Sequence, residues 1–258
     1  MQKRHHGPLP GAPGDLTVWG GVASFAKTVG QGMLDLLYPP RCLSCGKFGA
    51  EYLCESCISQ IEPVPEPYCS ICGHTLSGQA CFKCMGRAKA FTSARAVGVY
   101  SGTLRQAIHQ FKYNGARMLA DPLAGLLYKY LTTSCDYPWK RADCIIPVPI
   151  HPSRYRARGY NQSELLALKL SSLTGLPALG NALVRTRCTR PQVELSAEAR
   201  RINTKDAFTV ANPHLVERKT AILVDDVSTT SSTIYECSKA LIKHGATRVY
   251  ALCLAVDL

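Results

Sequence analysis

The sequence predicts an α/β protein in which a parallel sheet follows a small cysteine-rich module. Beyond residue 90, strand-like segments alternate with helix-like segments, a pattern that favours a parallel sheet with helices on both faces. Before residue 90, eight of the 13 cysteines fall within residues 42–84. We therefore expect three parts: a tail and helix (1–32), a cysteine-rich module (33–90) and an α/β domain (91–258).

Composition limits the classes of protein that this chain can represent. Of 258 residues, 46% are hydrophobic and only 19% are charged, which excludes global disorder. No uninterrupted apolar run reaches the roughly 18 residues that a transmembrane helix needs. The 30 Lys and Arg against 18 Asp and Glu give a formal net charge of +12, which favours anionic partners, either phosphorylated small molecules or nucleic acid.

The N-terminal residues precede the module and carry little chemistry. Residues 1–15 are rich in Gly and Pro, which predicts a disordered tail. Between residues 16 and 37 apolar side chains recur every three or four positions, which predicts an amphipathic helix that Pro39 and Pro40 end.

The cysteine-rich module carries four CxxC pairs, separated by 8, 11 and 8 residues. Each pair places two thiolates on one tight turn, and two turns make one tetrahedral Cys₄ zinc site. The spacing favours two sequential sites, with interleaved pairing as the alternative. The predicted zinc ligands are Cys42, Cys45, Cys54, Cys57, Cys69, Cys72, Cys81 and Cys84.

Disulfides and redox chemistry are the alternatives for these cysteines. Disulfides are typical of secreted chains, but the sequence shows no signal peptide. A thioredoxin-type site would need one CxxC beside a βαβ unit rather than four in series. Zinc is therefore the favoured interpretation, and it implies a reducing, cytoplasmic location. Eight thiolates and two Zn²⁺ would lower the formal net charge from +12 to about +8.

The α/β domain is predicted from the hydrophobic pattern of its segments. Apolar, β-branched runs predict strands, and apolar residues at three- and four-residue steps predict helices. Cys144 and Cys253 fall inside such strands, where a thiol is most often a small buried hydrophobe. The predicted strands are 94–100, 144–150, 220–224 and 249–256, and the predicted helices are 104–111, 118–131, 161–173 and 232–244.

The most informative stretch is 221–233, AILVDDVSTTSST, in which a strand leads into two acids, a hydroxyl-rich loop and a helix. In an open α/β sheet this order places Asp225 and Asp226 at the carboxyl end of a strand, where ligands bind. Loop amides, hydroxyls and the helix N-terminus suit a phosphate, whereas paired carboxylates suit sugar hydroxyls or Mg²⁺. A sugar phosphate satisfies both; a simple helix cap is the alternative. The predicted phosphate-loop residues are Ser228, Thr229, Thr230, Ser231, Ser232 and Thr233.

Two basic segments complete the predicted site. Residues 151–162 follow a strand end and carry Arg154, Arg156 and Arg158, and we predict a pyrophosphate-binding loop there because guanidinium groups match phosphate oxygens. A solvated basic face is the alternative. Residues 185–203 are mostly polar and suit a mobile loop that closes over a charged substrate.

VDDVSTTSST resembles the phosphoribosyl pyrophosphate (PRPP) signature of type I phosphoribosyltransferases. The resemblance implies that Asp225 and Asp226 hold the ribose hydroxyls and that residues 228–233 hold the 5′-phosphate. It also implies a sheet of the type I phosphoribosyltransferase kind. Ser228 and Ser231 depart from the aliphatic residue and the glycine usual in that family, and Thr229 replaces an acid that handles the base, which disfavours purine salvage.

The whole pattern resembles the ComF/GntX competence-protein family. Its carriers are the four CxxC pairs followed by FKY (111–113), PVP (147–149), RGYNQ (158–162), RTRCTRPQ (185–192) and RRIN (200–203). The resemblance implies a role with imported single-stranded DNA in natural transformation, and it implies single-stranded DNA and competence-machinery proteins as partners.

Two functional hypotheses follow. The first is a Mg²⁺-dependent phosphoribosyltransferase that uses PRPP. The second is a non-catalytic single-stranded DNA-binding or adaptor protein with a vestigial or regulatory PRPP site, in which Tyr155 and Tyr160 stack bases. DNA binding should weaken steeply with salt, whereas PRPP binding should depend on Mg²⁺ and on Asp225 and Asp226.

Overall fold

The computed structural model describes residues 40–49, 51–81, 83–84, 90–134, 139–187, 202 and 204–258. The predicted tail (1–15) and amphipathic helix (16–37) therefore lie outside the described residues. Most of the predicted mobile segment, 185–203, lies outside them too.

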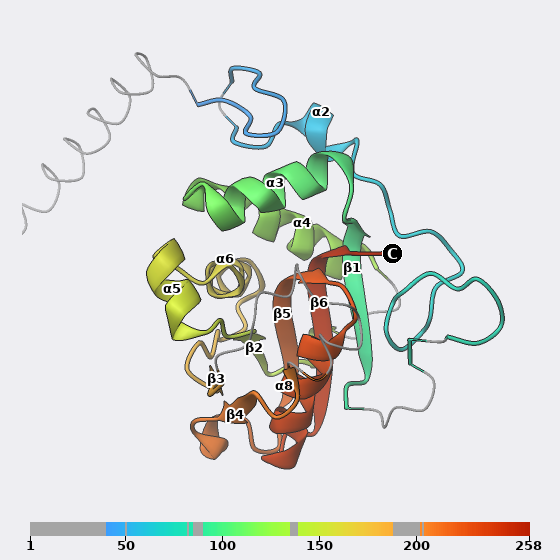
Figure 1. Ribbon diagram of the computed structural model, residues 1–258, viewed down its shortest axis with the longest axis vertical. Helices are drawn as coiled ribbons and strands as arrows, with labels where there is room; N and C mark the ends of the chain where they lie inside the picture. The colour runs from blue at the N-terminus through green and yellow to red at the C-terminus, as the bar shows by residue number, and fades with distance from the viewer. Residues whose placement is uncertain are drawn as a thin grey trace, which may run out of the picture.

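A parallel sheet forms the centre of the described chain, as predicted (Figure 1). Its strand order is β1-β6-β5-β2, and every neighbouring pair is parallel. β5 and β6 occupy the middle because most of their side chains are apolar and buried on both faces. The strands are β1 (Ser93–Val99), β2 (Cys144–Pro147), β5 (Thr220–Ser228) and β6 (Arg248–Val256).

Helices cover both faces of this sheet, which confirms the predicted layers. On one face α3, α4 and α6 pack against alternate strand residues such as Ile222 and Leu252. On the other face α8 packs against the intervening residues, such as Leu223 and Ala251. The helices are α2 (Glu55–Ile58), α3 (Gly102–Tyr113), α4 (Ala120–Thr133), α5 (Pro152–Arg158), α6 (Gln162–Thr174) and α8 (Ser232–Lys243), with 3₁₀ turns at Arg117–Leu119, Trp139–Arg141 and Pro213–Leu215.

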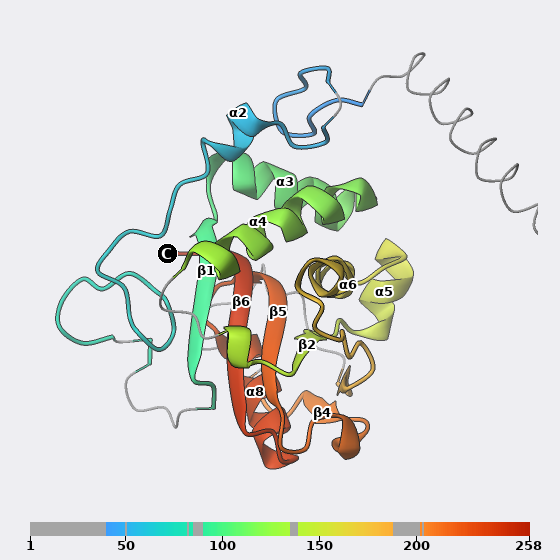
Figure 2. The ribbon, with the colours of Figure 1, turned by 180° about the vertical axis from the view of Figure 1, so that it is seen from behind.

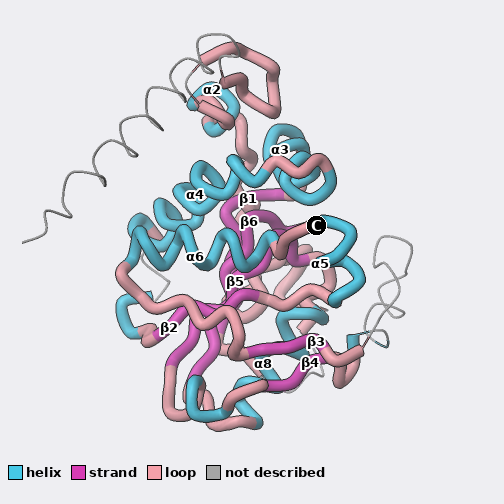
Figure 3. The backbone as a smooth tube through the Cα atoms, turned by 90° about the vertical axis from the view of Figure 1, so that its left-hand side faces the viewer, coloured by secondary structure: helices cyan, strands magenta, loops and turns pink. Residues whose placement is uncertain are grey.

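Three local features differ from the prediction. Residues 152–158 form helix α5 rather than a loop, because the His151 ring accepts the Ser153 amide and Pro152 begins the helix. β5 continues four residues past the predicted end, through both acids to Ser228. Two short strands, β3 (Leu183–Arg185) and β4 (Phe208–Val210), form an antiparallel ribbon apart from the main sheet (Figure 3).

The cysteine-rich module lies against the α/β domain in two places. Its first half, with α2, lies over α3, and its second half lies beside β1 (Figures 1 and 2). The amide of Val99 donates to the Glu62 carbonyl at 2.9 Å, and that of Ala94 donates to the Ile71 carbonyl at 2.6 Å. These bonds cover the free edge of β1, which would otherwise expose unpaired backbone groups.

Two further predictions concern burial and the membrane. Cys144 and Cys253 are buried in β2 and β6, as predicted, whereas Cys135 and Cys188 lie outside the described residues. Across the described ranges, no helix combines the length and apolar character needed to cross a bilayer.

Candidate functional site

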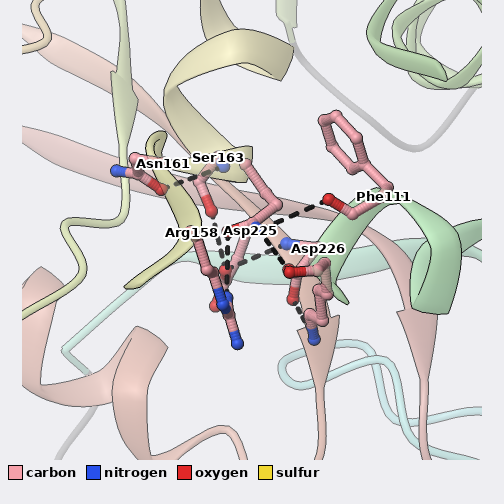
Figure 4. Close-up of polar contacts among 8 residues, drawn as sticks. Phe111, Arg158, Asn161, Ser163, Asp225 and Asp226 are labelled. Atoms are coloured by element: carbon pink, nitrogen blue, oxygen red, sulfur yellow. Dashed lines mark hydrogen bonds and ion pairs between the residues drawn. The ribbon is translucent and has the colours of Figure 1, made fainter. Parts of the chain in front are cut away.

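Asp225 and Asp226 lie at the carboxyl end of β5 and face two different elements (Figure 4). An Asp225 carboxylate oxygen accepts from the Ser163 hydroxyl at 3.0 Å and from the Asp226 amide at 2.9 Å. The Asp226 carboxylate pairs with the Lys112 ammonium at 2.8 Å. The acid pair is therefore held between the N-terminus of α6 and the C-terminal turn of α3.

The acid pair carries more negative charge than its surroundings neutralise. Burial, together with the neighbouring Asp226 carboxylate, raises the pKa of Asp225 to about 7. Burial alone would lower the pKa of Lys112, but the Asp226 carboxylate outweighs it and raises that pKa. A cation or a hydroxyl donor arriving at this edge would stabilise the ionised form of Asp225.

Three sequence motifs that are distant along the chain meet beside the acid pair. In the RGYNQ motif, the Tyr160 hydroxyl and the side-chain amide of Gln162 both donate to the Phe111 carbonyl of FKY, the Gln162 bond at 3.4 Å. The side-chain amide of Asn161 donates to the Val148 carbonyl of PVP at 3.1 Å. Because these contacts fix the C-terminus of α3 against the start of α6, they position Lys112 and Ser163 beside the acid pair. Figure 4 shows Ser163 pointing toward Asp225.

The predicted phosphate loop begins with the last residue of β5 and enters α8. The Ser228 and Ser231 hydroxyls lie 3.1 Å apart and those of Thr230 and Ser232 lie 2.8 Å apart. Ser231 precedes the helix in the left-handed region, at φ 54°, where glycine is favoured. Ser231 therefore carries a Cβ at a position where the backbone has a positive φ. This is the position at which the sequence departs from the glycine that is usual in the PRPP signature. Thr229, Thr230 and Thr233 are half-buried, and Ser228, Ser231 and Ser232 are buried.

Of the predicted arginines, Arg158 of helix α5 has contacts that reach this edge. Arg154 and Arg158, both half-buried, are four residues apart and therefore lie on one face of that helix. The Arg158 guanidinium donates to the Gln162 side chain at 3.0 Å and lies 5.0 Å from the centre of the Tyr113 ring. Gln162 thus links Arg158 to the network that holds the acid pair.

One predicted aromatic contact is wrong. Tyr160 is 4% exposed, because its ring packs on Phe111 and its hydroxyl is used by the Phe111 carbonyl, so it cannot stack a base. Tyr155 is 48% exposed on α5.

The eight CxxC cysteines gather into two sequential tetrads, the pairing that the spacing favoured. The first tetrad is Cys42, Cys45, Cys54 and Cys57; the second is Cys69, Cys72, Cys81 and Cys84. Sulfur atoms of different CxxC pairs lie 3.7 and 3.8 Å apart in the first tetrad and 3.9 and 3.5 Å apart in the second. A tetrahedral site with Zn–S bonds of about 2.3 Å has sulfur atoms about 3.8 Å apart, whereas a disulfide would place them at about 2.05 Å. The donor sets therefore fit two zinc ions.

The sequence interpretation missed several residues that build the site. Lys112 and Ser163 received no role, although the FKY motif contains the first and the second directly follows RGYNQ. The Lys112 contact joins segments more than 110 positions apart and the Ser163 contact joins segments more than 60 positions apart, which no local pattern reveals. His74, described below, was missed for the same reason.

Comparison with known proteins identifies a family model that matches the cysteine-rich module and relatives that match most of the chain. A family model described as a double zinc ribbon domain matches residues 33–85. The chain is 35% identical over 222 residues to competence protein F of Haemophilus influenzae, covering 83% of this chain and 96% of that protein. It is 34% identical over 223 residues to the DNA utilization protein YhgH of Escherichia coli O157:H7, covering 84% of this chain and 94% of that protein.

More distant matches include a curated relative and a solved structure. Competence protein ComFC of Streptococcus pneumoniae is 26% identical, covering 75% of this chain and 83% of that protein. A glutamine PRPP amidotransferase from B. subtilis is 19% identical with a TM-score of 0.38, and the match covers 56% of this chain but only 30% of that one.

The fold and its attached module define a class of protein: an α/β domain with a parallel sheet, joined to a double zinc ribbon. The matches to competence protein F and YhgH cover most of this chain and nearly all of each relative, and they identify the family. The chain belongs to the competence protein F family, together with the YhgH proteins, as the sequence motifs indicated.

Proposed function

We propose that this chain binds PRPP with Mg²⁺ at the carboxyl edge of its sheet. The observation that carries the proposal is the pair Asp225–Asp226, held by Ser163 and Lys112 directly ahead of a hydroxyl loop that enters the N-terminus of α8. Sugar hydroxyls donate well to carboxylates, and a helix N-terminus favours a phosphate. The two halves of the site lie in the order that a ribose 5-phosphate requires.

The roles of the residues follow from their chemistry. Asp225 and Asp226 would accept hydrogen bonds from the ribose 2′ and 3′ hydroxyls. Arg154 and Arg158 would contact the pyrophosphate, since α5 presents both from one face. The 5′-phosphate would contact the amides and hydroxyls of Ser228, Thr229, Thr230, Ser231, Ser232 and Thr233.

Magnesium fits the donor set at this edge. Mg²⁺ is usually held by one or two carboxylates together with substrate phosphates. Burial and the neighbouring Asp226 carboxylate raise the pKa of Asp225 to about 7, so a cation bound here would favour its ionised form. The same two carboxylates would hold the ion, which would neutralise charge on the pyrophosphate as that group leaves.

Transfer of the phosphoribosyl group is the activity that this arrangement supports. The bond from ribose C1 to pyrophosphate would break as a bond from C1 to an acceptor nucleophile forms. Lys112 and the α5 arginines would stabilise the departing negative charge, and the acid pair would fix the ring for attack. In this proposal residues 91–258 carry the site and residues 33–90 support it.

Titration calorimetry with Mg²⁺–PRPP tests the proposal. The double variant Asp225→Asn with Asp226→Asn should give no heat while retaining its zinc. Asp121→Asn is the matched control, since Asp121 is exposed and pairs with Lys169 on the helical face. Unchanged heats in the double variant would contradict the assignment of the acid pair.

A second candidate function is binding of single-stranded DNA, supported by the surface of α5 and the end of α3. Tyr113 is 54% and Tyr155 is 48% exposed, and Arg156 is exposed on the same short helix. Exposed aromatic rings interleaved with arginines suit stacked bases and a phosphate backbone. Replacing both tyrosines by alanine should weaken oligonucleotide binding, which should also fall steeply with salt. Salt-independent binding would contradict this candidate.

The setting of the protein follows from its thiols and its relatives. Eight reduced cysteines in two metal sites suit a reducing cytoplasm. The names of the relatives, competence protein F and DNA utilization protein YhgH, support a proposal that its partners act in competence or DNA utilization.

A further inference from the structure

The second cysteine tetrad contacts the hydroxyl loop through one buried imidazole. His74 lies two residues after Cys72, is 1% exposed, and its Nε2 lies 2.8 Å from the Thr229 carbonyl oxygen. A carbonyl oxygen only accepts, so Nε2 carries the hydrogen and donates it. This bond joins residues 155 positions apart.

The backbone of His74 is fixed by the tetrad itself. The Cys69 amide donates to the His74 carbonyl at 2.8 Å, and the Gly73 amide donates to the Cys69 carbonyl at 2.9 Å. Gly73 has φ +70°, and a Cβ there would lie 2.5 Å from the Ala94 carbonyl oxygen, so the turn packs tightly on β1. A metal ion bound by Cys69 and Cys72 would therefore hold the imidazole in place.

A second route runs from the same tetrad to the loop. Between two of its cysteines, Lys83 donates to the Asp257 carbonyl at 3.5 Å. The Asp257 amide donates to the Ser228 carbonyl at 2.9 Å. The second tetrad thus contacts both groups that donate to the loop carbonyls, His74 for Thr229 and Asp257 for Ser228.

The hydroxyl loop needs such support because its backbone is strained. Ser231 occupies the left-handed region, which costs a non-glycine residue free energy and persists only where the surroundings impose it.

The first tetrad contacts a different part of the domain. The Ser44 hydroxyl, between two of its cysteines, donates to the Gln106 side chain of α3 at 2.9 Å.

We propose that His74 is a positioning residue for the hydroxyl loop, so that zinc binding at the second tetrad and anion binding at the loop strengthen each other. The anion half of this statement rests on the proposed PRPP site. The coupling is reciprocal by thermodynamic necessity: whatever zinc does for the anion, the anion does for zinc.

Hydrogen exchange in the ligand-free protein tests the positioning role without PRPP. His74→Leu fills the same buried volume but lacks a donor, whereas the side-chain amide of His74→Gln can donate. Loss of the bond should speed amide exchange at residues 229–233 about fivefold, the size of effect that one hydrogen bond produces. His74→Gln should restore slow exchange, and His109→Ala, an exposed histidine on α3, is the control. Unchanged exchange in a His74→Leu protein with full zinc content would overturn the role.

Zinc release tests the coupling and needs no change at His74. Cys54→Ser leaves the second tetrad intact and Cys81→Ser leaves the first, so each variant reports release to a chelator from one site. Mg²⁺–PRPP should slow release about tenfold from the second tetrad and leave release from the first unchanged. Equal release with and without PRPP, in protein that binds PRPP by calorimetry, would overturn the coupling. If wild-type protein gives no heat with PRPP, the proposed function fails, and loop exchange in the ligand-free variants still decides the role of His74.

Discussion

The two cysteine tetrads have the same ligands and the same spacing, but they rest on different parts of the molecule. In the first, Cys42 and Cys57 join Leu53 in the apolar cluster formed by α3, α4 and α6. In the second, Cys69 and Cys72 join the cluster on the opposite face of the sheet, beside β1 and α8. One motif therefore serves two settings: the first tetrad packs on a helix, and the second braces a strand edge and the loop that enters α8.

The effect of a structural metal on the rest of the protein therefore depends on which residues its CxxC turns contact. Arg95 shows the difference: it is buried, donates to the Ser70 carbonyl between two ligands of the second tetrad at 3.0 Å, and lies 5.3 Å from the centre of the Tyr68 ring. The first tetrad instead packs into the cluster of α3, α4 and α6, and its Ser44 side chain bonds to α3, the helix that bears Lys112 near its end. Loss of each metal should therefore have different consequences.

The largest expected effect comes from removing one metal ligand at a time. Cys54 and Cys81 are matched, since each is the third cysteine of its tetrad and is half-buried. Each Cys→Ser variant should lose one zinc ion, but only Cys81→Ser should also weaken Mg²⁺–PRPP binding tenfold or more, by roughly the coupling free energies common between linked sites. Metal analysis and calorimetry on both proteins check this. Equal PRPP affinity in the two variants would contradict the claim that only the second tetrad supports the PRPP site.

The next effect concerns the packing of the first tetrad. Leu53 is 1% exposed and packs into the α3 cluster, so Leu53→Ala should reduce the free energy of unfolding by about 2–4 kcal/mol. Urea denaturation measures this loss. PRPP affinity of the folded variant should stay within about twofold of wild type, because the cavity lies away from the loop. A large loss of affinity would show that the first tetrad also supports the site.

A pH-dependent effect isolates the acid pair from both tetrads. The folded pKa of Asp225 lies near 7, above its value of 3.8 in an unfolded chain, so the folded state holds this proton more tightly. Stability from this group is full below pH 3.8 and is lost as pH rises through about 7. Between about pH 6 and pH 8 the free energy of unfolding should fall by about 1–2 kcal/mol more in wild type than in Asp225→Asn. Parallel urea denaturation curves for the two proteins at both pH values would contradict the shift.

The smallest effect concerns the strained residue of the loop. Ser231→Gly should raise the free energy of unfolding by about 0.5–1 kcal/mol, because glycine adopts φ 54° without a steric cost. Thermal denaturation measures the gain. Gly175→Ser, at a helix end with φ +76°, is the reverse control and should destabilise the protein. A loss of stability in Ser231→Gly would mean that the hydroxyl pair with Ser228 outweighs the backbone strain.

Much of the fold was predictable because it follows from local patterns. Unbroken apolar, β-branched runs predict buried strands such as 220–224, and leucines at helical spacing predict α6. Helix α5 was missed because its stability comes from capping by His151 and Gly159 rather than from an apolar face. The three-residue strands β3 and β4 were missed because segments that short carry no readable periodicity.

The candidate site was predictable only in part. Asp225, Asp226 and the hydroxyl loop form one continuous stretch, and the sequence shows their order directly. Their supports do not: Ser163, Lys112 and His74 come from three other segments, and only the packing of α6, α3 and the second tetrad brings them to β5. Tyr160 was misassigned for the same reason, since burial by α3 is a tertiary effect.

The most direct test of the central claim, that the carboxyl edge of the sheet binds Mg²⁺–PRPP, is the hydrogen-exchange footprint of that ligand on the wild-type protein. We expect protection at residues 225–233 and at the start of α6, with no change in residues 51–58 around α2. Protection absent from 225–233 while PRPP is bound would contradict the claim, because the ligand would then occupy another part of the molecule.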